Sequence, residues 1–477
     1  MRAISLVNRL EFEFTGNVVR NALCLGDVDN DGCNELVVGS ESGEVCIFKG
    51  KNKIQVISKL GFVSCLAVAD ILNQNKNSLV VITADGWCYI YEVPSEDDES
   101  AAEEVDGQIQ STSSTGSESK PKKKSEIINK SELVRIHVQR LPANAKNIVV
   151  GDVDGDGYNE MVLGLTDRVV RSYKWIPNTK LANLNDSTFP SELIDKLLGK
   201  FVAINKWECA NQIGSITLHH SWDGRPSLLI AQPGGTFMRI RCYAEETTET
   251  VNTADLSNSN GSQGETSIPD SVDYQFLGLS RMRNQNISTE ILGDFKNMQL
   301  DLENSTREGI GKGRPYAVAT LDGTIMLVQD EVILWAIAVD HQIFALTKLD
   351  ITGNGSDDIV ACSWDGQTYI LDQDKNSIRF PLDEPVQAFE SGYYNLDVNS
   401  KPVTCFVYVT FKNTIILYYD IPIKELTIRK FEPDIELLSQ LFIKEKGSKD
   451  AAVDYVKNMD KKKKRELVES LLYNVKS

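Results

Sequence analysis

Two short segments of the chain carry acidic residues at a spacing that is typical of a cation cage. Each has an aspartate at alternate positions, then a glycine, then a glutamate. The two copies are Asp27, Asp29, Asp31, Gly32 and Glu35, and Asp152, Asp154, Asp156, Gly157 and Glu160. Alternate carboxylates on a tight loop converge on one point, and hard cations with many oxygen ligands prefer such donors. The pattern predicts a Ca²⁺ site, in preference to Mg²⁺, in each loop, with the backbone carbonyl groups of Cys33 and Tyr158 as further ligands.

An alternative interpretation of these loops needs no metal. Aspartate side chains also cap backbone N–H groups in turns, so both loops can be turn chemistry alone. A third loop is a weakened copy with fewer carboxylates, and we expect it to bind a cation poorly. Its residues are Asp350, Thr352, Asn354, Gly355 and Asp358. These loops differ from an EF-hand because strand-like segments, and not helices, flank them.

The elements that must position the loops belong to an internal repeat. A strand–turn–strand unit, in which two apolar runs usually meet at a turn containing Asp, Gly or Asn, recurs along the chain. Its seven copies span residues 35–48, 79–91, 160–173, 228–240, 316–328, 358–371 and 406–419. A further apolar run precedes each copy, and Asp27 and Asp70, which end two of these runs, are 43 residues apart. A period of roughly 40–45 residues with several strands per unit is typical of a β-propeller blade.

The predicted fold class is therefore all-β, with a seven-bladed β-propeller over residues 1–420 and a C-terminal helical extension over residues 421–477. The leading strand, at residues 6–14, is expected to pair into the last blade and close the ring. Apolar residues three and four apart predict amphipathic helices at residues 433–442 and 451–475. These helices either pack on the propeller or dock a partner.

Three inserts interrupt the repeat. Residues 94–132 run from an acidic stretch through Ser, Thr and Gly to a PKKKS segment, residues 244–271 are rich in Glu, Thr, Ser and Asn, and residues 296–313 are polar. Such compositions bury too little apolar surface to offset the entropy of ordering. The sequence predicts that all three are disordered loops.

The composition excludes several classes of function. The net charge is −18, whereas a nucleic-acid-binding surface needs clustered Lys and Arg. No apolar stretch approaches the length of a membrane span, so we expect no direct membrane insertion. Residues 1–14 do not resemble a secretory signal, and most of the nine cysteines fall in strand-like runs, which indicates a reducing, cytoplasmic setting. The four histidines show no metal-ligand spacing and no nucleophile motif occurs, so the sequence predicts no catalytic residues and no enzyme.

The loop sequences resemble a known repeat. LGDVDNDGCNELVVG at residues 25–39 returns as VGDVDGDGYNEMVLG at residues 150–164, and both resemble the FG-GAP repeat of the integrin α-subunit propeller. Together with TDRVVRSYKW (166–175), VDHQIFALTKLDITGNG (339–355) and ACSWDGQTYI (361–370), they make the chain similar to the integrin-alpha FG-GAP repeat-containing protein 2 family. The resemblance spans all seven blades, although the inserts at 94–132 and 244–271 look private to this chain.

This resemblance implies a subunit of the KICSTOR complex. Such a subunit pairs with a kaptin-like propeller and, with a large KICSTOR scaffold subunit, brings a GATOR1-type GTPase-activating complex to the lysosomal surface. The implied role is to restrain TOR complex 1 signalling when amino acids or glucose are scarce. Integrins use their propellers in Ca²⁺-rich fluid outside the cell, so calcium occupancy does not carry over. The alternative class is a Ca²⁺-dependent adhesion or carbohydrate-binding module, against which the missing secretory signal and the scattered cysteines argue.

The insert assignment predicts the pattern of limited proteolysis. We expect a protease at low concentration to cut first within 94–132 and 244–271 and to leave a compact core, because unstructured loops are the preferred sites of nicking. Mass spectrometry of the first fragments locates the cuts. Early cleavage within residues 320–420 would contradict the assignment of the blades.

Overall fold

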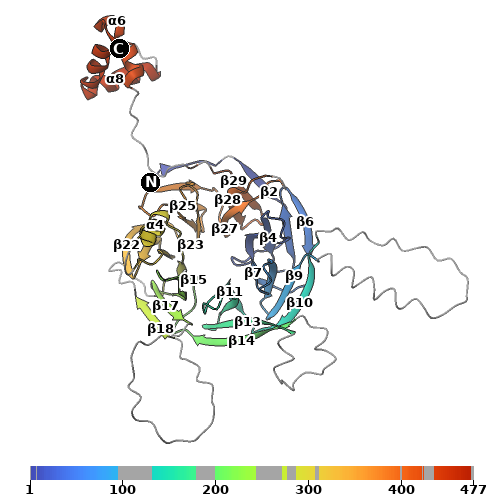
Figure 1. Ribbon diagram of the computed structural model, residues 1–477. Coiled ribbons are helices and arrows are strands. Elements are labelled where there is room, and N and C mark those ends of the chain that lie inside the picture. Colours follow the sequence, from blue (N-terminus) through green and yellow to red (C-terminus); the bar gives the residue numbers. More distant parts are fainter. Residues whose placement is uncertain are drawn as a thin grey trace, which may run out of the picture. The chain divides into compact units, whose positions relative to one another are not determined.

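A computed structural model of the chain describes residues 2–6, 8–94, 132–178, 199–242, 271–276, 286–306, 311–397, 400–421, 423 and 435–473. Two compact units are present, Met1–Leu426 and Thr427–Ser477. The first unit is the seven-bladed β-propeller that the sequence predicts (Figure 1). The inserts expected at 94–132 and 244–271 lie, apart from their end residues, outside the described residues.

The first three blades each form a four-stranded antiparallel sheet whose strands follow chain order from the inside of the ring outwards (Figure 1). Blade 1 consists of β3 (Leu23–Gly26), β4 (Glu35–Gly39), β5 (Val45–Lys49) and β6 (Asn52–Ile57). Blade 2 consists of β7 (Val63–Ala69), β8 (Ser78–Thr83), β9 (Trp87–Glu92) and β10 (Val134–Arg140). Blade 3 consists of β11 (Ala145–Gly151), β12 (Glu160–Leu165), β13 (Val169–Pro177) and β14 (Gly199–Glu208).

The next two blades repeat this order, and the last two also take in strands from the start of the chain. Blade 4 consists of β15 (Ile216–His220), β16 (Pro226–Gln232), β17 (Thr236–Arg241) and β18 (Ser271–Phe276), and blade 5 of β19 (Thr289–Leu292), β20 (Tyr316–Thr320), β21 (Thr324–Gln329) and β22 (Val332–Ala338). Blade 6 consists of β23 (Ile343–Leu349), β24 (Asp358–Ser363), β25 (Gln367–Leu371), β26 (Ser377–Pro381) and β1 (Arg2–Ala3). Blade 7 consists of β27 (Val386–Tyr394), β28 (Val403–Thr410), β29 (Ile415–Tyr419) and β2 (Arg9–Phe12).

The second strand of each blade forms the core. In β4, β8, β12, β16, β20, β24 and β28 nearly every residue is buried, because neighbouring blades cover both faces of the sheet. A strand that is buried on both faces has a continuous apolar sequence and not an alternating one. Glycine allows the closest approach between blades, since a Cβ atom on Gly39 would lie 2.5 Å from Cγ1 of Val63 in blade 2, and one on Gly164 would lie 2.6 Å from Cδ1 of Ile216 in blade 4.

The ring closes as the sequence predicts. β2 pairs antiparallel with β29 of the last blade, with Leu10 opposite Leu417 and Phe12 opposite Ile415. Strand β1, which was not predicted, adds a short parallel pairing to β26 of blade 6. The first residues of the chain thus complete the blades made by its last strands.

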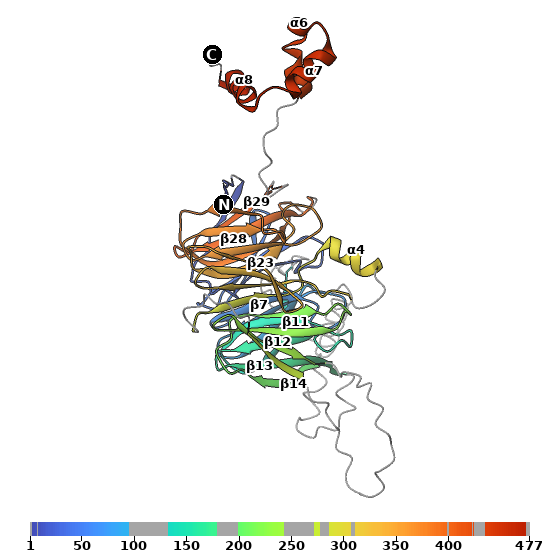
Figure 2. The ribbon, with the colours of Figure 1, turned by 90° about the vertical axis from the view of Figure 1, so that its left-hand side faces the viewer.

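The prediction of a disordered loop at 296–313 is wrong for residues 298–306. Residues Met298–Thr306 form the helix α4, which stands out from one face of the ring in Figure 2. Asn297 caps this helix by accepting a hydrogen bond from the Leu300 backbone N–H at 3.0 Å, and Leu300 is buried. The cap and the buried Leu300 side chain help to order a segment whose composition is mostly polar.

The second unit is helical, as predicted. It contains α5 (Ile435–Gln440), α6 (Ile443–Lys446), α7 (Lys449–Lys457) and α8 (Lys461–Tyr473). Ser448 caps α7 by accepting a hydrogen bond from the Ala451 N–H, and Ala452 and Val456 are its buried residues. Among the described residues, no helix is long and apolar enough to cross a membrane.

The contribution of ring closure to stability can be tested with a substitution in β2. Phe12 is 5% exposed and its ring centroid lies 4.7 Å from that of Phe48 in blade 1. Phe12→Ala should lower the free energy of unfolding of the propeller by about 3–5 kcal/mol, because a buried aromatic side chain is removed. Urea unfolding followed by circular dichroism measures the loss.

Arg9→Ala in the same strand is the control. The Arg9 side chain is exposed and its ion pair with Glu11 lies on the surface, where such pairs contribute little. Equal midpoints for the two variants would show that β2 does not hold the ring closed.

Candidate functional site: the acidic loops

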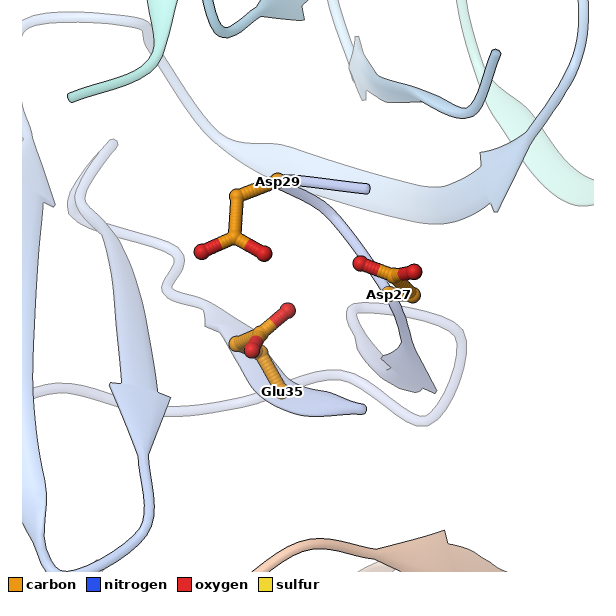
Figure 3. Close-up of side chains that lie close together, drawn as sticks. All are labelled: Asp27, Asp29 and Glu35. Carbon is orange, nitrogen blue, oxygen red and sulfur yellow. The ribbon is translucent and has the colours of Figure 1, made fainter. Parts of the chain in front are cut away.

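The two acidic loops lie at equivalent places in blades 1 and 3, each between the innermost strand and the second strand. In each loop one oxygen from each of three acids lies within 4.8 Å of the others, an arrangement that could hold a metal ion. The triads are Asp27, Asp29 and Glu35, and Asp152, Asp154 and Glu160. Figure 3 shows the first triad, with its carboxylates facing a common space.

The first aspartate of each loop builds the turn. Asp27 accepts hydrogen bonds from the Asp31 N–H at 3.1 Å and the Gly32 N–H at 2.8 Å, one on each oxygen. Asp152 does the same for Gly155 and Gly157, at 2.6 and 2.9 Å. Gly32, Gly155 and Gly157 have positive φ angles between 80° and 85°, which favour glycine.

A backbone N–H group of the same loop holds the glutamate of each triad. One oxygen of Glu35 accepts the Val28 N–H at 3.0 Å, and one of Glu160 accepts the Val153 N–H at 3.1 Å. Both side chains are fully buried. Burial raises the pKa of Glu35 to about 7, although a hydrogen bond from Lys49 lowers it.

The remaining predicted site residues lie at the edge of each triad. Asp31 and Asp156 accept hydrogen bonds from the N–H groups of Cys33 and Tyr158, respectively. Cys33 is buried and Tyr158 is 48% exposed. The role of their carbonyl groups as ligands stays a prediction.

A lysine that the sequence analysis missed enters each loop from the third strand of the blade. Lys49 Nζ lies 2.5 Å from Asp29 Oδ2, 2.7 Å from Asp31 Oδ2 and 2.9 Å from Glu35 Oε1. Burial alone would lower the pKa of Lys49, but its three carboxylate partners outweigh burial and raise it, so the ammonium stays charged at neutral pH. The lysine is 14 positions beyond Glu35 in sequence, and only the hairpin register brings the two together.

The second loop repeats the arrangement. Lys174 pairs with Glu160 in the register of β12 and β13, and its Nζ lies 3.0 Å from Glu160 Oε1 and 3.8 Å from Asp154 Oδ2. It also contacts Asp156 Oδ2 directly. The same three kinds of carboxylate therefore surround an ammonium group in both blades.

The loops also fasten neighbouring blades through asparagines. The Asn77 N–H of blade 2 donates to Asn30 Oδ1 of blade 1 at 2.7 Å, and Asn30 Nδ2 donates back to the Asn77 carbonyl at 3.0 Å. Asn159 of blade 3 and Asn73 of blade 2 make the same reciprocal pair, at 2.6 and 3.2 Å. Asn34 of blade 1 donates through its N–H to Asn395 of blade 7 at 2.9 Å. We call these contacts the asparagine clasps.

Comparisons with known proteins agree with this geometry. A family model for integrin-alpha FG-GAP repeat-containing protein 2 matches residues 49–423. The mouse KICSTOR complex protein ITFG2 is 34% identical over 450 residues, which cover 92% of this chain and 91% of the mouse protein. The chain belongs to the integrin-alpha FG-GAP repeat-containing protein 2 family.

Other relatives support the family and the fold. The bovine KICSTOR complex protein ITFG2 is 32% identical over 435 residues, covering 89% of this chain and 73% of the bovine protein. The crystal structure of BBS1N in complex with ARL6DN, soaked with mercury, aligns with a TM-score of 0.52 over 90% of this chain and all of that one, at 12% identity. At that identity the likeness concerns the fold alone.

This family member also has a cavity on the axis of its ring, which sequence reasoning did not find. Its volume is about 340 Å³, and residues from all seven blades line it. Arg20 Nη1 pairs with Glu290 Oε1 at 2.6 Å, while Lys348 Nζ donates to the Gly293 carbonyl at 2.9 Å. Glu390 on β27 accepts its own neighbour's N–H, from Ser391, at 3.1 Å. These charged groups lie far apart in the sequence and meet only in the folded ring, so no local motif predicts them.

The histidines form one further polar group. His219 is buried, and the His220 side chain is half-buried. Both approach Asp294, with His220 Nδ1 at 2.5 Å from Oδ2 and His219 Nδ1 at 3.4 Å from Oδ1. Burial lowers the pKa of His219 to about 4, whereas the hydrogen bond with Asp294 raises that of His220. The group joins blade 4 to the β19–β20 connection.

The Glu390 carboxyl predicts part of the pH dependence of stability. Burial raises its pKa from 4.5 to about 7, so the folded chain keeps a proton that the unfolded chain has released between these two values. Stability should therefore fall as pH rises from 5 to 8. Thermal unfolding of Glu390→Gln should show a smaller fall over this range than the parent protein.

The exposed Glu13→Gln is the matched control and should leave the pH profile unchanged. If Glu390→Gln and the parent lose the same number of degrees between pH 5 and 8, Glu390 is ionised in the folded state and its raised pKa is wrong.

Proposed function

We propose that this chain is a non-enzymatic scaffold subunit of a KICSTOR-like complex. In this role it associates with a kaptin-like propeller and a large scaffold subunit. The assembly helps to recruit a GATOR1-type GTPase-activating complex to lysosomes and so restrains TOR complex 1 signalling under amino-acid or glucose limitation. The observation that carries the proposal is family membership over nearly the whole chain, with relatives that are named as KICSTOR complex proteins.

The chemistry of the described residues supports a binding role. Cys24 lines the axial cavity, but burial raises the pKa of its thiol, which keeps it in the unreactive neutral form. Arg20 is paired with Glu290. A rigid ring whose charged groups are paired with one another is suited to binding other proteins. It does not supply the nucleophile and general base that catalysis needs.

A candidate contact surface surrounds α4. Trp222, Met298 and Leu302 are 49%, 53% and 61% exposed, and we call them the α4 surface. Trp222 lies beside Gly311 and Gly313, which follow α4 in the same connection. Met298 and Leu302 are four residues apart and so occupy one side of the helix.

The α4 surface is held rigidly on the ring. The Met298 N–H donates to Ser356 Oγ of blade 6 at 3.1 Å, and Asn297 Nδ2 donates to Gln373 Oε1 at 2.7 Å. Asn304 bonds the Lys312 backbone through both its amide oxygen and its amide nitrogen. An exposed apolar side of a firmly held helix loses little entropy on binding, and tryptophan and methionine are enriched in protein interfaces.

Association assays test this proposal. We expect Met298→Lys/Leu302→Lys to reduce recovery of the kaptin-like and large scaffold subunits by at least about tenfold, since charges would be placed in an apolar contact. The measurement is quantitative mass spectrometry of proteins that co-purify with the tagged full-length chain. In cells that lack the chain, this variant should also fail to restore the fall in TOR complex 1 activity on amino-acid withdrawal.

Glu303→Lys is the control on the same helix, because it adds positive charge without touching the apolar pair. Full recovery of both subunits by Met298→Lys/Leu302→Lys would move the contact elsewhere on the chain. A parent protein that recovers neither subunit would overturn the scaffold function itself.

A further inference from the structure

We propose that Lys49 and Lys174 take the place of the divalent cation in the two acidic loops, so that blades 1 and 3 are built around internal ammonium groups and do not use calcium. The FG-GAP-like spacing predicts calcium ligands there, and the carboxylates do converge. The residues present do not fit the ion, because a side chain of the same blade already fills their common space.

The Lys49 ammonium group occupies the space that an ion would need. Lys49 Nζ is within 2.9 Å of oxygens from Asp29, Asp31 and Glu35, three members of the predicted ligand set. Calcium–oxygen distances are about 2.3–2.6 Å, so a Ca²⁺ ion that bound these same oxygens would need the space that Nζ occupies. The ammonium and the ion exclude each other sterically and by charge.

A lysine takes the same place in the second acidic loop. Lys174 contacts Asp154, Asp156 and Glu160 in blade 3. The lysine side chains are only 16% and 26% exposed, so both are part of the packed loop and are not solvated surface groups. Two independent copies argue against a chance contact.

The loop conformation itself needs neither a metal ion nor a lysine on the third strand. In blade 2 the residues equivalent to Glu35 and Lys49 are Ser78 and Glu92, which hydrogen-bond each other at 2.5 Å. Asp70 nevertheless caps the N–H groups of Gln74 and Asn75, at 2.8 and 2.7 Å, as Asp27 caps its own turn. The asparagine clasps also form on both sides of this blade. The first aspartate and the asparagine thus suffice for the turn, and the lysine neutralises the acids that remain.

The experiment compares thermal unfolding of the full chain in EDTA and in 5 mM CaCl₂. The parent protein should show the same midpoint in both. In EDTA, the unfolding midpoints of Lys49→Met and Lys174→Met should each be lower than that of the parent. Calcium should raise each variant's midpoint by about 2 °C or more, because an ion that binds only the folded state stabilises it. Asp29 Oδ1 is buried without a hydrogen-bond partner and is available to the ion once the lysine is gone.

Lys53→Met, on the neighbouring strand β6, is the control, and calcium should not raise its unfolding midpoint. Lys174 is the more exposed of the two, so Lys174→Met keeps the test open if Lys49→Met does not fold. A calcium-dependent rise in the parent that Asp29→Asn or Asp154→Asn abolishes would overturn the proposal. So would lysine variants that fold and gain no calcium-dependent stability.

Discussion

The structure depends on burial of each blade between its neighbours. The second strands are apolar on both faces, and no single blade can keep both faces out of water. Burial is complete only in a closed ring, which makes the pairing of β2 with β29 a condition for all seven blades and not a local detail. The glycines at the blade contacts serve the same constraint, because Gly39 and Gly164 leave room for Val63 and Ile216 of the next blade.

The acidic loops follow from this constraint. A loop at the inner end of a blade must turn sharply, satisfy its backbone N–H groups and meet the neighbouring blade. Asp27 and Asp152 supply the turn, and the asparagine clasps supply the contact. The other acids are left close together at low solvent exposure, where their mutual repulsion needs a counter-charge. A lysine on the third strand supplies that charge with a covalently attached group, whose local concentration does not depend on the surrounding solution.

Sequence periodicity was enough to predict the blades, the closing strand and the turn aspartates, since each is a short-range pattern. It could not predict Lys49 or Lys174, because a lysine 14 positions from a glutamate has no meaning until the hairpin register is known. Helix α4 was missed for a different reason. MQLDLENST has few apolar residues, and the helix is fixed by Asn297, Leu300 and contacts to Ser356 of another blade. The charges that line the axial cavity could not be predicted, because Arg20, Lys348 and Glu390 come from three different blades and lie far apart in the sequence.

The loops have diverged where the framework permits it. Blades 1 and 3 keep an acid–lysine cluster, blade 2 replaces it with Ser78 and Glu92, and blade 5 carries α4 in the equivalent connection. Lengthening a loop whose two ends are already fixed costs little additional entropy. The β19–β20 connection could therefore acquire a helix with an exposed apolar side while the strands that flank it stayed in register. Rigid strands that fix the ends of variable loops are the physical reason why one ring can hold its shape and still carry a helix that only one blade inserts between its first two strands.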